Sequence, residues 1–274
     1  FWWIMLKWID STHIYDVIFV NNILLSTNIY PQLEKKDFQE IKDFLVKHYP
    51  EKWIIFRSIN ETNQDYINFL EELWCKKIIF RQIFLSYKEK ILEYNKIKEI
   101  KSDKHLYKKW DYTKISKETF SDEELWEIKQ CYDELYIKKY SLINPNLTLD
   151  FYRNLTKNKY FHINLLQNTQ WEINAAYCYY IINQQVTAPI FGYKKEKLYR
   201  HITHAYLHEW LSKADVLNWS SWVWKFKINR WAQKTTEFIL VHFKNLSLIK
   251  RIVWNIILFF SIHIWEKYFK KYII

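Results

Sequence analysis

Two serines, a lysine and an arginine lie close together in the last quarter of the sequence. Ser220 and Ser221 follow a strand-like run, and Lys227 and Arg230 lie in the short helical stretch after them. A spacing of three residues places Lys227 and Arg230 on one face of a helix. Two such cations could clamp a phosphate or a carboxylate, while small serines let a ligand approach the backbone. The alternative is a solvated surface pair.

Other side chains could handle protons. Tyr140 ends a long helical pattern and Tyr193 ends a strand-like run, so each is a candidate for substrate contact or proton delivery. The alternative for both is a tyrosine in the core or at its rim. Glu237 is the best-placed carboxylate for a general base.

Three histidines share one helical face. His201, His204 and His208 are spaced i, i+3 and i+7, but no acidic ligand is patterned nearby except Glu209. We therefore expect a polar helix face here and no metal site.

Hydrophobic periodicity predicts two lobes of strands and helices. The first lobe covers residues 1–105 in the order β, α, β, α, β, and residues 88–117 form a weakly patterned, lysine-rich link. The first residue is Phe1, so we expect the N-terminus to be cut short. The strands are expected at 14–20, 53–56 and 77–87, and the helices at 38–48 and 66–73.

The second lobe covers residues 106–245. Ser121 is a good N-cap for a helix over 122–140 whose first turn is acidic. The Asn183–Gln184 step predicts a tight turn between two strands. Further helices are expected at 148–156, 198–209 and 223–229, and strands at 160–166, 173–182, 185–191, 216–219 and 235–244. The fold class is α+β, with a mixed, mostly antiparallel sheet flanked by helices.

Composition restricts the partners. The formal net charge is +11 and the pI is about 9.2, which favours a nucleotide-bearing cofactor, an anionic membrane surface or nucleic acid. The 3 cysteines have no metal or disulfide spacing. We expect no signal peptide. We expect a cytoplasmic protein, with contact to the inner face of the membrane as an option.

Tryptophan stands where glycine is usual. The chain has 1 Gly and 15 Trp, although average usage gives roughly nineteen glycines. Trp74 and Trp210 follow helical patterns at the position where glycine ends helices, and Trp171 lies in a predicted hairpin turn. Trp222 lies within the stretch of residues 220–230, which holds Ser220, Ser221, Lys227 and Arg230 and is called the 220–230 cluster below, and Trp231 follows it directly. We hypothesise that UGA codons meaning glycine were translated as tryptophan; the alternative is a protein truly rich in aromatic residues.

The tail, residues 246–274, is apolar with basic flanks. Only the stretch from Ile252 to Trp265 lies between the charges of Arg251 and Glu266, whereas a membrane span needs about twenty residues. We expect an amphipathic helix that caps the core or lies on a membrane surface.

Several segments resemble two-lobed bacterial acyltransferases of the GNAT superfamily, of the FemAB-like and BioF-like kind. They are Phe19-Val-Asn-Asn-Ile-Leu-Leu-Ser-Thr-Asn-Ile-Tyr-Pro31, Ile55-Phe-Arg-Ser-Ile-Asn60 with Arg81-Gln82, Lys139-Tyr-Ser-Leu-Ile-Asn-Pro145, Pro189-Ile-Phe-Gly-Tyr193 and Asn218-Trp-Ser-Ser-Trp-Val-Trp-Lys-Phe-Lys-Ile-Asn-Arg-Trp-Ala232. With glycine at 222 and 231, the last segment is similar to the family's Ser-Ser-Gly, Phe-Lys and Arg-Gly-Ala pattern. The resemblance covers essentially the whole chain.

The resemblance implies transfer of an acyl group from a thioester, acyl-CoA in most such enzymes, to a small-molecule or peptidyl amine. It implies a donor arm between splayed strands and phosphates near a helix N-terminus, here Gly192, Lys194, Lys195 and Arg200 with the 220–230 cluster. The chain lacks the superfamily's Gln/Arg-x-x-Gly-x-Gly/Ala loop, so aminoacyl-tRNA stays open as the donor.

A second hypothesis is a non-catalytic basic module that binds RNA or an anionic membrane. Between the two, we expect an enzyme that forms no stable complex with nucleic acid.

Overall fold

The computed structural model describes residues 15–22, 27–94, 96–195 and 198–265. The chain folds into two compact units. Among the described residues, the first contains 15–22, 30–83 and 235–265, and the second contains 27–29, 84–94, 96–195 and 198–234. The main boundaries between the units therefore fall at 83/84 and 234/235, whereas the sequence pattern predicts boundaries at 105 and 245.

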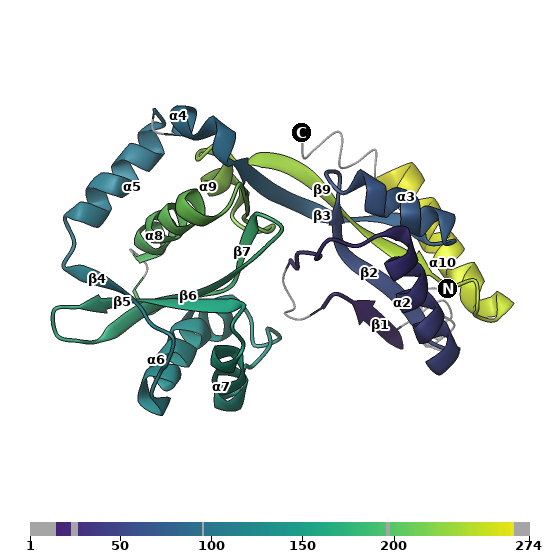
Figure 1. The fold of residues 1–274 in the computed structure, drawn as a ribbon, viewed down its shortest axis with the longest axis horizontal. Helices are drawn as coiled ribbons and strands as arrows, with labels where there is room; N and C mark the ends of the chain where they lie inside the picture. The colour runs from purple at the N-terminus through teal and green to yellow at the C-terminus, as the bar shows by residue number, and fades with distance from the viewer. Residues whose placement is uncertain (1–14, 23–26, 95, 196–197, 266–274) are drawn as a thin grey trace, which may run out of the picture. The chain divides into compact units, whose positions relative to one another are not determined.

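The first unit is a small sheet with helices on both faces (Figure 1). Its sheet has the order β1-β2-β9-β3, in which β1 runs parallel to β2 and β2 antiparallel to β9. The elements are β1 (Val17–Val20), α2 (Lys35–His48), β2 (Trp53–Asn60), α3 (Gln64–Glu72), β3 (Lys76–Tyr87), β9 (Gln233–His242) and α10 (Leu248–Phe260), which a π-helical turn, Ser261–Trp265, follows.

Alternating residues of β2 pack in two separate hydrophobic cores of this unit. Ile54 and Phe56 pack with Phe38 of α2 and Leu70 of α3 on one face. Trp53 and Ile55 point to the other face, because successive strand residues alternate. There they pack with Trp254 of α10, whose ring centroid lies 5.4 Å from that of Trp53.

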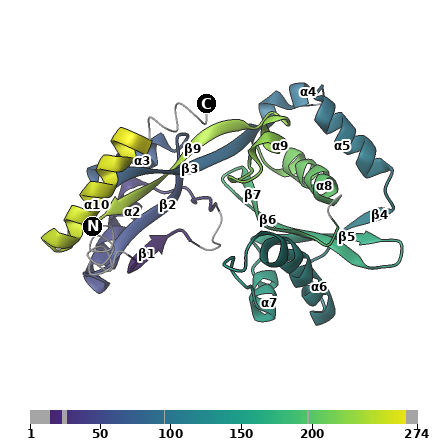
Figure 2. The ribbon, with the colours of Figure 1, turned by 180° about the vertical axis from the view of Figure 1, so that it is seen from behind.

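The second unit is a larger mixed sheet in the order β3-β8-β7-β6-β5-β4 (Figure 2). The pair β7–β8 is parallel, and the other described pairings are antiparallel. Its elements are the end of β3, α4 (Ile91–Tyr94), α5 (Lys98–Lys108), β4 (Tyr112–Ser116), α6 (Asp122–Tyr132), α7 (Leu149–Lys157), β5 (Phe161–Asn168), β6 (Ile173–Ile182), β7 (Gln185–Tyr193), α8 (Leu198–Lys213), β8 (Val216–Asn218) and α9 (Trp224–Ile228).

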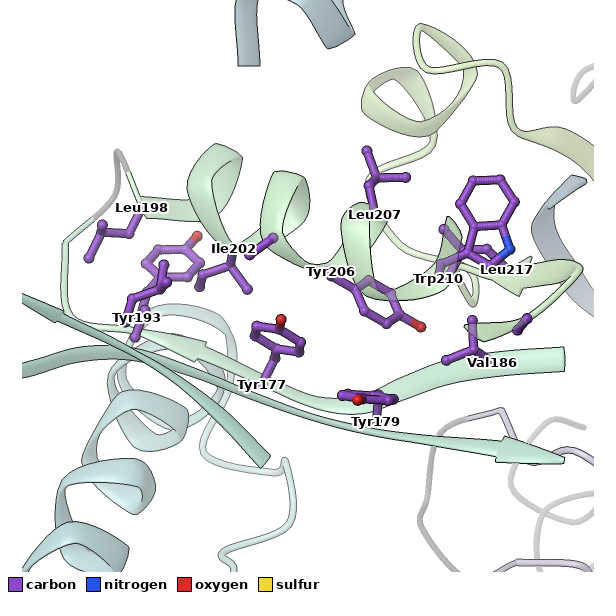
Figure 3. Close-up of a cluster of buried hydrophobic side chains, with 14 of the residues drawn as sticks. Tyr177, Tyr179, Val186, Tyr193, Leu198, Ile202, Tyr206, Leu207, Trp210 and Leu217 are labelled. Carbon is purple, nitrogen blue, oxygen red and sulfur yellow. The ribbon is translucent and has the colours of Figure 1, made fainter. Parts of the chain in front are cut away.

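Helices cover both faces of this second sheet. Helix α8 packs on one face, where Tyr177, Tyr179 and Tyr206 lie between the helix and the strands (Figure 3). Helices α6 and α7 pack on the other face. Gly192 of β7 makes this second contact possible, since a Cβ there would lie 2.5 Å from the backbone carbon of Cys131.

Most predicted elements are confirmed. Ser121 caps α6 through a capping box, and the π-helical turn Asp133–Tyr140 continues that helix to the predicted end. Asn183 and Gln184 both have positive φ, as a tight hairpin turn requires. The predicted α+β class, with a mixed, mostly antiparallel sheet, is therefore correct.

Two predictions are wrong. Residues 88–117, predicted as a weakly patterned link between the lobes, are part of the second unit, because they contain α4, α5 and β4, and β4 pairs with β5. Their weak pattern reflects burial of a few side chains such as Ile97 beneath an otherwise polar, lysine-rich surface. Trp210 does not follow a helix; it lies within α8, fully buried, with its ring 5.5 Å from that of Tyr94.

Three other tryptophans take the left-handed conformation that favours glycine. The φ angles are 68° at Trp74, 66° at Trp171 and 64° at Trp231. Trp74 and Trp231 each close a Schellman-type helix end: the amide after each donates to a carbonyl five residues back, Leu70 and Lys227 respectively. Trp222 does not have positive φ, although its neighbour Val223 does.

No helix within the described residues is long and apolar enough to cross a membrane. The predicted tail helix is present as α10, and residues 266–274 of the tail lie outside the described part of the chain.

Candidate functional site

The second unit contains a fork between two parallel strands. β7 and β8 pair only from Gln185 to Thr187, opposite Val216 to Asn218. Beyond this point β7 continues through Pro189, which has no amide hydrogen to donate, while the segment after β8 stays hydrogen-bonded to Phe84 of β3 through Trp219 and Ser220. The described pairing of β7 with β8 thus ends at Thr187 and Asn218. The sequence resemblance predicts a donor arm between splayed strands, and this is where the second sheet offers such a place.

The turn at the end of β8 is held in one shape by side chains. Ser220 has a φ of 59°, and its amide donates to Asn218 Oδ1 at 2.9 Å. The buried Lys227 of α9 donates its Nζ to the carbonyls of Trp219 and Ser220, at 2.5 and 3.1 Å. Thr27 also donates to the Ser220 hydroxyl at 3.0 Å. Lys227 therefore fixes the Ser220 turn from inside.

Arg230 has a different set of partners. Its Nε lies 2.7 Å from Oδ2 of Asp103, and its guanidinium stacks 3.4 Å from the ring centre of Phe226. Arg200 binds the other oxygen of Asp103, at 2.5 Å. Asp103 is fully buried, so one carboxylate joins α5, α8 and the end of α9. Arg200 and Arg230 meet here, while Lys227 binds the Ser220 turn.

Aromatic side chains connect the predicted tyrosines to this arginine. Tyr193 lies 6.0 Å from Tyr199, and Tyr199 lies 4.6 Å from Phe226, between ring centroids. Tyr136 packs 6.1 Å from Tyr140, which is 55% exposed. Burial raises the pKa of Tyr136 and of Tyr199 well above the ordinary tyrosine value. These two phenols are therefore protonated at neutral pH, as hydrogen-bond donors and not as bases.

The loop between β7 and α8 carries the remaining candidates. Gly192 packs directly against the backbone of α6. Lys194 lies 3.4 Å from Glu127 of α6, and Lys195 is exposed to solvent. Ser221 is partly exposed beside the Ser220 turn.

Glu237 lies in the first unit, apart from the other candidates. It is fully buried on β9, where its two oxygens accept hydrogen bonds from Arg81 at 2.8 and 3.4 Å. Arg57 on the neighbouring β2 lies between the rings of Phe19 and Phe80, at 5.6 and 5.8 Å from their centres. The pKa of Arg57 is lowered, first by burial and then by Arg81. Glu237 thus neutralises part of a buried cationic cluster.

The helix face that carries the three histidines is mostly buried, whereas the sequence predicts a polar face. His201 and His204 are buried and only His208 is exposed. Burial, with repulsion from His208, lowers the pKa of His204 to about 4. No group of histidine, cysteine and acidic side chains suited to a metal ion occurs among the described residues.

Two hollows flank α8 and α9. One, of about 540 Å³, lies between the start of α5 and the end of α9 and includes Lys96, Lys98, Asn229 and Trp231. The other, of about 270 Å³, includes His204, His208 and Glu209. Lys114 and Lys213 both bind Glu209 and lower its pKa to about 2, against the opposing effect of burial.

Sequence reasoning missed Asp103, Tyr199 and Phe226. Asp103 lies in the stretch interpreted as a link, so its carboxylate seemed solvated. Tyr199 and Phe226 precede Arg200 and Lys227 directly, and only the register of two separate helices brings their rings together. A buried aspartate facing two arginines is a pairing that sequence spacing alone does not indicate.

No protein-family model matches this sequence, and no curated protein is similar to it in a sequence search. Solved structures do match. L-PGS from Bacillus licheniformis is 17% identical and aligns over 81% of this chain and 77% of its own, with a TM-score of 0.56. FemX is 9% identical over 82% and 80%, with a TM-score of 0.59.

A third match extends this pattern. The C-terminal domain of a putative lysylphosphatidylglycerol synthetase from Agrobacterium fabrum is 8% identical over 81% of this chain and 78% of its own, with a TM-score of 0.60. The chain has a GNAT-like fold. This confirms the resemblance seen in the sequence, and at such low identity it shows the fold alone.

Proposed function

We propose that the protein is an acyltransferase that moves an acyl group from an activated donor to an amine. The observation that supports it best is the fork of β7 and β8, whose mouth lies beside the Ser220 turn. Direct transfer requires mainly that donor and amine be held in line, with hydrogen-bond donors for the developing oxyanion. A fixed turn with a buried lysine behind it suits such positioning.

The described side chains divide the work. Lys227 and Asn218 hold the turn at Ser220, while Tyr136 and Tyr199 remain protonated and can donate hydrogen bonds. Tyr140 is exposed at the edge of the same tyrosine group and is our candidate for contact with the substrate or for proton delivery. Glu237 is bound to Arg81 in the other unit, so we do not assign it the role of base.

The donor is a thioester such as acyl-CoA, with aminoacyl-tRNA as the alternative. Lys195 and the neighbouring Lys194 supply positive charge for phosphates in either case. The missing phosphate loop is the reason to keep the second donor in the test. The acceptor is an amine on a small molecule or a peptide, and no metal takes part.

The tryptophans affect this proposal. We retain the hypothesis that UGA-encoded glycine stands at 74, 171 and 231 in the natural protein. Trp231 borders the 540 Å³ hollow, so its indole occupies space that glycine would leave open. Activity is therefore best tested with glycine at these positions, and UGG codons there would contradict the hypothesis.

The test is transfer to a panel of amines from acetyl-CoA, longer acyl-CoAs and aminoacyl-tRNA, with product identified by mass spectrometry. Replacement K227M should lower kcat at least ten-fold, because the carbonyls of Trp219 and Ser220 lose their donor. Replacement K225M is the matched control, since Lys225 is exposed on the same short helix. The absence of transfer from every donor would contradict the proposal.

A further inference from the structure

One side of helix α10 is a continuous apolar surface that nothing in the described structure covers. The exposed side chains are Leu248, Ile249, Ile252, Ile256, Phe259 and Phe260, with exposures of 66, 59, 41, 43, 56 and 53%. With about 100° per residue, all six lie within a sector of about 120°. Ile262 extends the row, at 51% exposure.

The opposite side of α10 anchors the helix to its unit. Val253 and Trp254 are buried, and Trp254 packs against Trp53 and Phe243. Lys250 reaches Glu51, at 3.0 Å from its carboxylate. The exposed row is therefore presented by a fixed helix, and its members have no role in holding the helix in place.

The sequence around this row carries charges of one sign. Lys244 and Arg251 lie at the start of the segment 244–265, which contains no aspartate or glutamate, and Lys250 in the same stretch is paired with Glu51. The protein as a whole carries a net charge of +11. A partner for this helix must accept apolar side chains and attract positive charge. An anionic bilayer does both, because its acyl chains lie just below a negatively charged surface.

We propose that α10 binds the interface of an anionic lipid bilayer, lying in the plane of the surface with its six apolar side chains among the acyl chains. The helix has 13 residues, about 20 Å in length, which suits a position along the surface. Such binding needs no acyl transfer, so it stands independently of the proposed function.

Vesicle sedimentation with the full chain tests this. Vesicles of equal parts phosphatidylglycerol and phosphatidylcholine should bind the protein at least ten-fold more tightly than phosphatidylcholine alone, and 0.5 M salt should weaken the binding. The double replacement I252E/F259E should abolish binding, because both side chains are exposed and their charges oppose insertion. F44E on α2, where Phe44 is 57% exposed, is the control and should bind like the unchanged protein.

Circular dichroism checks that the variants fold. The proposal is overturned if the unchanged protein fails to bind anionic vesicles, or if I252E/F259E binds as well as F44E does. It is also overturned if the row joins two copies of this chain. In that case the unchanged protein sediments as a dimer, I252E/F259E as a monomer, and neither binds vesicles.

Discussion

At the scale of single residues, the tryptophans with positive φ differ in whether other contacts compensate for the backbone strain. A side chain other than glycine in the left-handed region costs about 1–3 kcal/mol. Trp171 bears this cost without compensation from the core, because it is 80% exposed in the turn between β5 and β6. Trp74 is partly compensated, since the ammonium of Lys244 lies 3.7 Å from its ring.

Replacement W171G should therefore raise the free energy of unfolding by about 1 kcal/mol, after the greater entropy of glycine in the unfolded chain is subtracted. Urea unfolding measures it. W126G is the matched control: Trp126 is 50% exposed but lies within helix α6, where glycine costs about 1 kcal/mol. Opposite signs for the two variants are expected, and a loss of stability in W171G would contradict the strain argument.

At the scale of elements, one glycine sets the distance between β7 and α6. A methyl group at Gly192 would lie 2.5 Å from the backbone of both Cys131 and Tyr132. Backbone atoms cannot rotate away as a flexible side chain can, so the helix itself must move. We expect G192A to destabilise the protein by about 3 kcal/mol or more. Thermal unfolding measures this, and a change below about 1 kcal/mol would mean that the helix shifts freely.

The carboxylate of Asp103 has a similar role between α5, α8 and α9. Replacement D103N leaves Arg230 buried without a counter-charge, which costs about 3 kcal/mol. The matched control is D150N, because the ion pair of Asp150 with Arg153 is exposed and screened by solvent, so its loss should change stability little. Chemical denaturation of the two variants should differ accordingly, and equal effects would show that burial of Asp103 is unimportant.

Local patterns in the sequence predicted most elements, and long-range pairing explains what they missed. Ser121 and the Asn183–Gln184 turn were recognisable because caps and tight turns depend on neighbouring residues. Trp210 was misplaced because α8 is buried on almost every side, so no polar face marks where the helix ends. Glu237 was assigned to the second lobe because nothing in its neighbourhood indicates that Arg81, far away in sequence, binds it.

At the scale of the whole molecule, both units contain a histidine that burial keeps neutral. The pKa values of His204 in the second unit and His242 in the first are lowered to about 4, chiefly by burial. In the unfolded chain each would titrate near 6.5. Between these values the unfolded state binds more protons than the folded state. The free energy of unfolding is therefore unaffected by these histidines above pH 6.5 and falls as the pH approaches 4.

We expect the free energy of unfolding to decrease by roughly 3 kcal/mol between pH 7 and pH 4.5, after allowing for partial relaxation around the rings. Urea unfolding at intervals of half a pH unit measures the slope. The double replacement H204Q/H242Q should flatten it, because glutamine stays neutral throughout. H48Q should keep the original slope, since His48 is exposed on α2. If H204Q/H242Q loses stability as steeply as the unchanged protein, the carboxylate ion pairs and not these histidines cause the sensitivity to acid.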